Sequence, residues 1–155
     1  MIIVFFSFTK ILVEDYLSNG ITNNSDYMCE YIWPAIDEKL RKTRPKKGAK
    51  GIFLHFDNSP IHKSQKSKQK LDELGFTLLP HPAYSPDIAP SDFWLFEFID
   101  RSRIALEAVD DNHLISQVQD VLEKIDKTVL GVVFNEWIRR LHMVIESGGE
   151  YIPNK

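Results

Sequence analysis

Two short polar stretches decide how this chain is interpreted: HFDNSPIH at residues 55–62 and YSPDIAPSD at residues 84–92. The first follows a compact apolar run, Gly51 to Phe56, which predicts a buried strand ending next to the carboxylate of Asp57. Reacting groups in open α/β sheets gather at such strand ends, so Asp57 is a candidate site residue. An isolated aspartate after a strand is also a common turn former, and that alternative stays open.

The second stretch supplies another candidate carboxylate, Asp92. Ser91 is a good helix N-cap, so a helix is expected to begin there with Asp92 in its first turn. Asp92 could then be only a first-turn acid favoured by the helix dipole. Asp87 is expected to shape the loop rather than to bind metal. Four prolines predict that this loop is extended, since proline fits neither a helix interior nor a central strand: Pro80, Pro82, Pro86 and Pro90.

The first third of the chain predicts a hairpin followed by a helix. Ile2 to Phe8 and Ile11 to Leu17 are β-prone runs separated by a short polar turn. A helix is expected from Asn24 or Ser25, with a kink at Pro34. Its apolar residues recur every four positions and predict one core stripe: Met28, Ile32, Ile36 and Leu40.

The rest of the chain predicts mostly helices. Lys63 to Leu74 is expected to be a helix capped by Gly75, followed by the short strand Phe76 to Leu79. Gly148-Gly149 is expected to end the last helix. Two apolar patterns mark the C-terminal helices, Leu114, Val118, Val121, Leu122 and Ile125 in one and Val133, Trp137, Leu141, Val144 and Ile145 in the other. Three aromatic side chains are expected in the core: Trp94, Phe96 and Trp137.

Composition favours an intracellular globular protein. The chain has 155 residues and 43% hydrophobic content, enough for one domain with a real core. Cys29 is the single cysteine, so neither an intramolecular disulfide nor a thiolate zinc site is expected. The apolar run at the N-terminus is far shorter than a bilayer span and is interpreted as a strand, neither signal peptide nor anchor.

Charge is distributed unevenly along the chain. The net charge is -3, but the segment Lys39 to Lys70 holds eleven basic residues against the single acid Asp57, so it carries +10 and the remainder -13. Such a segment can attract a polyanion, although a solvated loop and helix face would have the same composition. Arg41 to Lys50 also resembles a nuclear import signal. The candidate DNA contacts are Lys46, Lys47, Lys50, Lys63 and Lys66.

Both polar stretches closely resemble segments of the mariner transposases. That family's catalytic domain has a His-x-Asp-Asn-x-x-x-His segment and, later, a Tyr-Ser-Pro-Asp-Leu-Ala-Pro-Ser-Asp segment. Its second and third catalytic carboxylates match Asp57 and Asp92, which 34 residues separate here. Residues 23–29 and 134–151 are similar to further segments of the family. Residues 59–61, Ser-Pro-Ile, depart from the family's Ala-Arg-Pro and remove an arginine beside Asp57.

The resemblance implies an α/β fold with a ribonuclease H-like mixed sheet flanked by helices. Residues 1–155 would form a single domain, a partial mariner catalytic domain without its helix-turn-helix modules. The fold is expected to be truncated and to lack the first, central strand, which carries the family's first catalytic Asp. That strand would lie between the strands matched by Ile2 to Phe8 and Gly51 to Phe56, so these two should either close up or stay separate.

The resemblance also implies a cofactor and a partner. Mg²⁺, or Mn²⁺, would bind Asp57 and Asp92, with His55, Asn58 and His62 beside the ion or serving only as structural residues. Because the family uses three carboxylates, binding is expected to be weakened. DNA is the expected partner and a second copy of the chain, forming a homodimer, is a further candidate, whereas neither a membrane nor a small-molecule substrate is expected. Whether the chain is an enzyme stays open, since the first catalytic Asp is not matched.

Three functional hypotheses follow. The first is a truncated mariner-like catalytic domain whose ancestral role is Mg-dependent DNA strand cleavage and transfer in cut-and-paste transposition, inactive alone. The second is a non-catalytic DNA-binding or dimerisation module, either by itself or as part of a longer domesticated transposase fusion protein. The third is an active nuclease whose missing Asp is supplied by an upstream exon.

Overall fold

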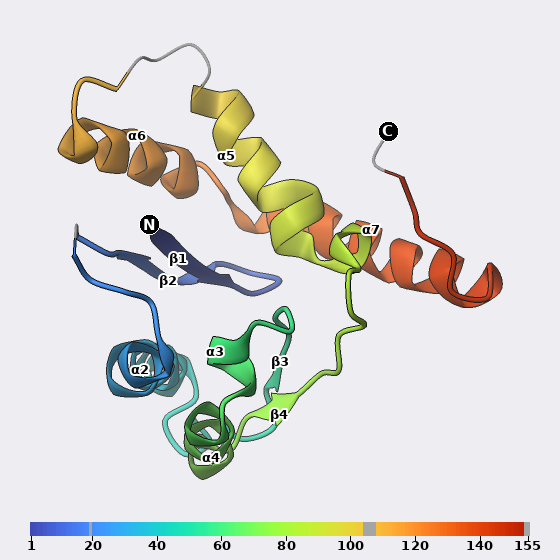
Figure 1. Cartoon of the computed structure of the whole chain (residues 1–155), viewed down its shortest axis with the longest axis horizontal. Coiled ribbons are helices and arrows are strands. Elements are labelled where there is room, and N and C mark those ends of the chain that lie inside the picture. Colours follow the sequence, from blue (N-terminus) through green and yellow to red (C-terminus); the bar gives the residue numbers. More distant parts are fainter. Residues whose placement is uncertain (19, 104–107, 154–155) are drawn as a thin grey trace. The chain divides into compact units, whose positions relative to one another are not determined.

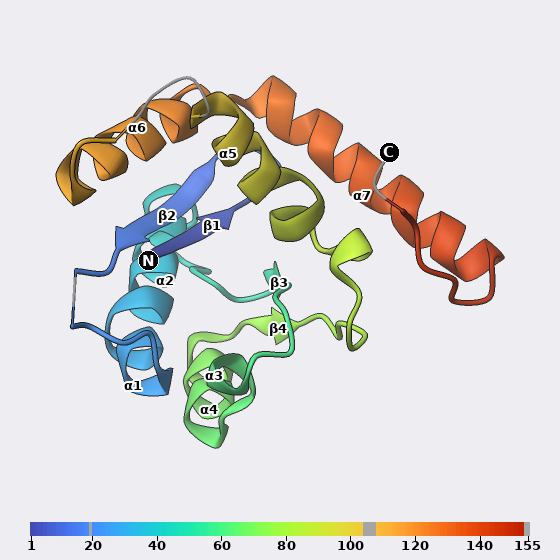
Figure 2. The same cartoon turned by 45° about the horizontal axis from the view of Figure 1, so that its top comes forward.

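The computed structural model describes residues 1–18, 20–103 and 108–153 (Figures 1 and 2). The chain divides into two compact units, each described here by itself. Unit 1 consists of Met1–Phe6 and Leu12–Ala83, and unit 2 of Ser7–Ile11 and Tyr84–Lys155. In the described part of the chain, none of the helices combines the length and apolarity that crossing a membrane requires.

The predicted N-terminal hairpin is present. Strands β1 (Ile2–Phe6) and β2 (Ile11–Tyr16) form a two-stranded sheet. At its turn the amide of Ser7 donates to the carbonyl of Lys10 at 2.9 Å, and at its open end Leu17 donates to Met1 at 2.9 Å. β1 ends two residues before its apolar run does, because the turn begins at Ser7, and β2 ends one residue before its run, at Tyr16.

The first helix starts where its cap predicts and buries the predicted stripe. The side chain of Asn24 accepts from the amide of Tyr27 at 2.9 Å, ahead of α1 (Ser25–Tyr27). A π-helix, η1 (Met28–Ile32), then leads into α2 (Trp33–Thr43). Pro34 falls in the first turn of α2, where its missing N–H costs little. Between 0% and 7% of each stripe residue is exposed: Met28, Ile32, Ile36 and Leu40.

The second sheet of unit 1 is much smaller than the apolar pattern predicts. Strands β3 (Phe53–Leu54) and β4 (Thr77–Leu78) pair in parallel, Phe53 with Thr77 and Leu54 with Leu78. The expected strand Gly51 to Phe56 is therefore wrong in length, and it is not buried on both faces because Phe53 is 65% exposed. Among the described residues β3 pairs only with β4, and β4 is short, so the pairing ends after two residues.

Two helices connect β3 to β4. They are α3 (Pro60–Lys63) and α4 (Gln65–Leu74), so the single helix expected from Lys63 is wrong at its start. Ser64 separates them, because its hydroxyl caps α4 by accepting from the amide of Ser67 at 3.1 Å. Gly75 ends α4 as expected, with φ +88°.

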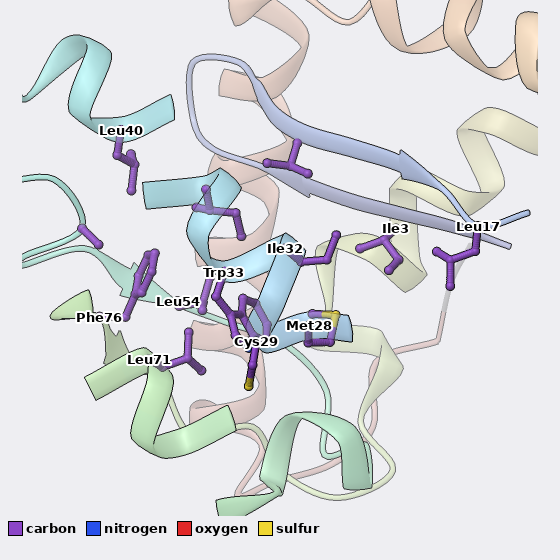
Figure 3. Packing of buried hydrophobic residues seen from close by; sticks show 13 residues of the cluster. Ile3, Leu17, Met28, Cys29, Ile32, Trp33, Leu40, Leu54, Leu71 and Phe76 are labelled. Carbon is purple, nitrogen blue, oxygen red and sulfur yellow. The ribbon is translucent and has the colours of Figure 1, made fainter. Parts of the chain in front are cut away.

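The expected break in the sheet is present in the described residues. The strands that should flank the absent central strand, β1 and β3, belong to separate two-stranded sheets and remain apart rather than closing up. Helices fill the interior instead: one apolar cluster joins Ile3 of β1, Leu54 of β3 and Leu71 of α4 around the buried Trp33 (Figure 3). Unit 1 is thus held by helix packing more than by sheet pairing.

Unit 2 is helical. It contains a 3-10 turn, η2 (Pro86–Ile88), and a π-helix, η3 (Ser91–Leu95), that continues as α5 (Phe96–Arg103). Pro90 rather than Ser91 is the cap, so Ser91 is the first helical residue. The long C-terminal helices are α6 (Asp111–Glu123) and α7 (Lys127–Glu146). Carboxylate caps begin both, Asp110 on the amide of His113 and Asp126 on the amides of Thr128 and Val129.

One of the expected core side chains of unit 2 lies at the surface. Phe96 is 44% exposed, so placing it in the core was wrong. Phe96 follows a π-helical turn, which rotates later side chains away from the face that an α-helical spacing predicts. Trp94 and Trp137 are half-buried, and the Trp137 indole donates to the carbonyl of Ile88 at 2.9 Å.

Candidate metal and nucleic-acid site

Asp57 lies just beyond the end of β3 in unit 1, in the turn that leads to α3. One carboxylate oxygen, Oδ1, accepts from the amide of Ser59 at 3.1 Å and faces Nδ1 of His62 at 2.9 Å. The side chain is 59% exposed. Asp57 is therefore oriented by two neighbours and still open to solvent, as a carboxylate that takes a hydrated ion must be.

The imidazole of His62 is fixed by ring packing. Its centroid lies 4.5 Å from that of Phe56 and 6.0 Å from that of Trp33, and its side chain is only 17% exposed. Because a carboxylate only accepts, Nδ1 of His62 carries the proton in this contact. Packing against the buried Trp33 thus fixes the ring of His62, and His62 in turn orients the carboxylate of Asp57.

His55 and Asn58 both contact His81, a residue that the sequence reasoning did not single out. Nε2 of His55 lies 3.0 Å from Nδ1 of His81, and Nδ2 of Asn58 donates to the carbonyl of His81 at 2.7 Å. Burial, with a smaller contribution from His81, lowers the pKa of His55 to about 4, so His55 is neutral at neutral pH. Because β3 and β4 run parallel, the segments that follow them lie side by side. The contacts with His81 connect these two segments.

Asp92 is the second residue of η3 in unit 2 and is exposed. The loop ahead of it is held by Asp87, which is only 3% exposed. The side-chain carboxylate of Asp87 accepts from the amide of Ile152 at 2.8 Å, and the backbone carbonyl of Asp87 accepts from the Arg140 guanidinium at 2.9 Å. Asp87 therefore shapes the loop, as expected, and C-terminal segments support it.

The two candidate metal ligands belong to different units, Asp57 to unit 1 and Asp92 to unit 2. A shared ion between them stays a prediction. Within residues 1–18, 20–103 and 108–153, no cluster of three or more His, Cys, Asp or Glu side chains suited to a metal ion is found.

All five lysines expected to contact DNA are exposed. Lys46, Lys47 and Lys50 lie in the loop after α2, and Lys63 ends α3. Lys66 in α4 forms an ion pair with Asp26 of α1, and this hydrogen bond is the main reason that the pKa of Lys66 is raised. Because Asp26 and Lys66 are 40 positions apart in the sequence, no local sequence pattern predicts this ion pair.

Comparison with protein-family models gives no match, whereas curated proteins do match. The chain is 26% identical over 152 residues to the human histone-lysine N-methyltransferase SETMAR, covering 97% of this chain and 22% of SETMAR. It is 36% identical over 100 residues to the Mariner Mos1 transposase of Drosophila mauritiana, covering 62% and 28%. It is 31% identical over 93 residues to the transposable element Tcb2 transposase of Caenorhabditis briggsae, covering 60% and 34%. The aligned regions thus span between 22% and 34% of each relative.

Solved structures confirm the ribonuclease H-like mixed α/β fold. The catalytic domain of Mos1 mariner transposase superposes with a TM-score of 0.86 at 22% identity, covering 97% of this chain and 74% of that chain. The same domain with raltegravir and Mg gives 0.86 at 24% identity, with 97% and 75% covered. The Mos1 paired-end complex with the left transposon end gives 0.85 at 22% identity, with 97% and 44% covered.

Proposed function

We propose that the chain is a transposase-derived domain of the mariner type that binds DNA through its basic segment and keeps a remnant of a carboxylate metal site. The observation that carries the proposal is the position of Asp57. An exposed carboxylate follows β3 and is oriented by Ser59 and His62, in the segment that resembles the family's second catalytic carboxylate.

The carboxylates of Asp57 and Asp92 are ligands of the kind that a hard divalent cation takes. Mg²⁺ and Mn²⁺ take oxygen ligands and keep several waters, so one or two open carboxylates suffice for weak binding. Asp57 would supply one ligand and Asp92 the other. Bound there, the ion would polarise a phosphodiester and activate an attacking hydroxyl. The similarity to Mos1, whose catalytic domain has been solved with Mg and with Mn, supports this choice of metal.

We expect the 155-residue chain by itself not to cut or join DNA. In-line cleavage and transfer use two ions that the family holds with three carboxylates, and this chain matches two of them. The ancestral role, Mg-dependent strand cleavage and transfer in cut-and-paste transposition, would then survive only as DNA and metal affinity.

Incubation of the purified chain with labelled transposon-end duplex in Mg²⁺ or Mn²⁺ tests this directly. The expected result is salt-sensitive binding, indifferent to sequence, without nicked product. Metal-dependent cleavage that disappears in Asp57→Ala would contradict the inactive state, and absence of binding at about 50 mM salt would contradict the DNA-binding role.

A second candidate is a non-catalytic DNA-binding or dimerisation module within a longer fusion protein. One observation favours it: 97% of the chain aligns with 22% of SETMAR, a protein described as a histone methyltransferase. DNA binding that persists in EDTA and in Asp57→Ala would support this candidate. Light scattering coupled to size-exclusion chromatography would show whether the chain dimerises.

A nuclear location is a further part of the proposal, based on the basic run Arg41 to Lys50. A fluorescent fusion of the chain tests it. Accumulation in the nucleus that is lost when Lys46 and Lys47 become alanine is the expected result, and unchanged distribution of that variant would contradict the signal.

A further inference from the structure

The loop that follows α2 is basic and closed by its own arginine. We define the basic loop as residues 44–50, Arg-Pro-Lys-Lys-Gly-Ala-Lys, which contain four basic residues and no acid. The Arg44 guanidinium donates to the carbonyls of Gly48 and Lys50, each at 3.0 Å. The amide of Gly48 donates back to the carbonyl of Arg44 at 2.8 Å. Arg44 therefore serves the loop's shape, while Lys46, Lys47 and Lys50 are exposed to solvent.

A buried carboxylate lies directly under this loop. Asp37 of α2 is 6% exposed. Its Oδ1 accepts from the amide of Ala49 at 2.8 Å, and its Oδ2 accepts from Nε of Arg41 at 2.5 Å. Burial of a carboxylate is costly unless such donors satisfy it, so the contact requires both partners to stay in place.

Gly48 allows the loop to press against that carboxylate. Its φ is +50°, and a Cβ built there would lie 2.5 Å from Oδ1 of Asp37, so no larger residue fits without displacement. On the other side, Gly75 at the end of α4 has φ +88°, and a Cβ there would lie 3.3 Å from Cα of Lys50. The basic loop is thus held from two helices.

An acid beneath a surface that attracts phosphates opposes binding by its charge, so electrostatics does not account for Asp37. Shape does. Ordering a flexible side chain or loop at an interface costs conformational entropy, and a loop ordered beforehand avoids part of that cost. Phosphate contacts position a protein on duplex DNA, and they need donors at fixed spacing.

We propose that Asp37 and Gly48 are positioning residues that hold the basic loop in the shape that contacts the backbone phosphates of duplex DNA. The proposal rests on the proposed DNA-binding function. It makes a prediction of opposite sign to simple electrostatics: removing the negative charge of Asp37 should weaken DNA binding.

A comparison of Asp37→Ala with Glu38→Ala tests this. Glu38 is the next residue of α2, is exposed at its side chain and pairs with Lys42, so Glu38→Ala makes the same charge change without touching the loop. With a fluorescent duplex at low salt, Glu38→Ala should bind as tightly as wild type or tighter. Asp37→Ala should bind about three- to tenfold more weakly, and Gly48→Ala, which keeps every charge, should weaken too.

Folding and function are separated by further measurements. Asp37→Asn keeps an acceptor for the Ala49 amide and should retain more affinity than Asp37→Ala. Hydrogen exchange at the Ala49 amide should be faster in Asp37→Ala. Thermal unfolding of the same variant shows whether the whole fold has lost stability. If Asp37→Ala fails to fold, Gly48→Ala decides the matter, because it displaces the loop and keeps every charge.

Two outcomes would overturn the proposal: Asp37→Ala binding as tightly as Glu38→Ala, or Gly48→Ala binding like wild type. Wild-type protein that binds no duplex at all would instead overturn the proposed function, and this proposal with it.

Discussion

The imidazole of His62 holds the carboxylate of Asp57, with 2.9 Å between Nδ1 and Oδ1. The ring is in turn packed against Phe56 and Trp33. A side chain at the surface is thereby connected to one of the most buried residues of unit 1, since Trp33 has 0% exposure. Groups that orient a ligating carboxylate contribute to metal affinity although they do not touch the metal.

His62→Ala should weaken Mn²⁺ binding by about tenfold, because Asp57 would lose one of its two orienting donors. Electron paramagnetic resonance of free Mn²⁺ measures the affinity. The matched control is His113→Ala, which alters an imidazole of α6 in unit 2. Equal Mn²⁺ affinity in wild type and His62→Ala would show that the contact is only structural.

The exposed edge at β3 should promote self-association. In the described residues β3 pairs only with β4, and Phe53 on β3 is 65% exposed. Free strand edges with apolar side chains are sites of aggregation, and a lysine there prevents it. Phe53→Lys should therefore lower concentration-dependent light scattering.

Val132→Lys provides the comparison for that experiment, since Val132 is similarly exposed, at 66%, but lies on helix α7. If both lysine variants lower scattering to the same degree, general surface hydrophobicity, and not the strand edge, is responsible.

Much of unit 1 could be predicted because its signals are local. The stripe on η1 and α2 follows from apolar spacing, and the cap Asn24 follows from side-chain chemistry at a helix start. The length of β3 could not be predicted, because it depends on how far β4 runs beside it. The contact of His55 with His81 likewise exists only after two strands have paired.

In the candidate site the same division holds. Motif similarity pointed to Asp57 and His62, which the structure places in contact. Lys66 was selected by charge, yet its partner Asp26 comes from another helix and could not be inferred from composition. Asp37 was overlooked because a single acid in a helix carries no signal until the loop that it supports is folded.

The core of unit 1 should be sensitive to truncation of side chains. Ile36 is 1% exposed and belongs to the cluster around Trp33. Ile36→Ala should lower the free energy of unfolding by about 2–5 kcal/mol, through lost burial and the cavity left behind. Urea unfolding followed by circular dichroism measures it. Ile138→Ala, at a position 52% exposed, should change stability by less than about 0.5 kcal/mol.

Stability should fall at alkaline pH through Tyr27. Its hydroxyl donates to Oδ2 of Asp15 at 2.6 Å, and this hydrogen bond is the main cause that raises the pKa of Tyr27 to about 12. The pKa of a tyrosine in the unfolded chain is about 10. At a pH between the two pKa values the folded state keeps a proton that the unfolded state has lost. The stabilisation is complete below about pH 10 and disappears as pH rises through about 12.

Unfolding of wild type and Tyr27→Phe across this pH range tests the assignment. The variant should lose part of the decline, while Tyr16, whose pKa burial raises to about 12, contributes equally in both proteins. Identical slopes in the two proteins would show that the Tyr27 contact does not stabilise the folded state.

Asp57 and Asp92 are predicted to hold one divalent ion in solution. Each residue lies in a separate unit, Asp57 after β3 and Asp92 in the first turn of η3. If both ligate the same Mn²⁺, removing either should weaken binding strongly, and the double variant should be little worse than the more severe single one. Residues that act on one bound ion are coupled in this way, whereas independent sites give additive losses. Asp120→Ala, at an exposed position of α6, controls for net charge. Additive losses for Asp57→Ala and Asp92→Ala, or losses no larger than that of Asp120→Ala, would reject a shared metal site.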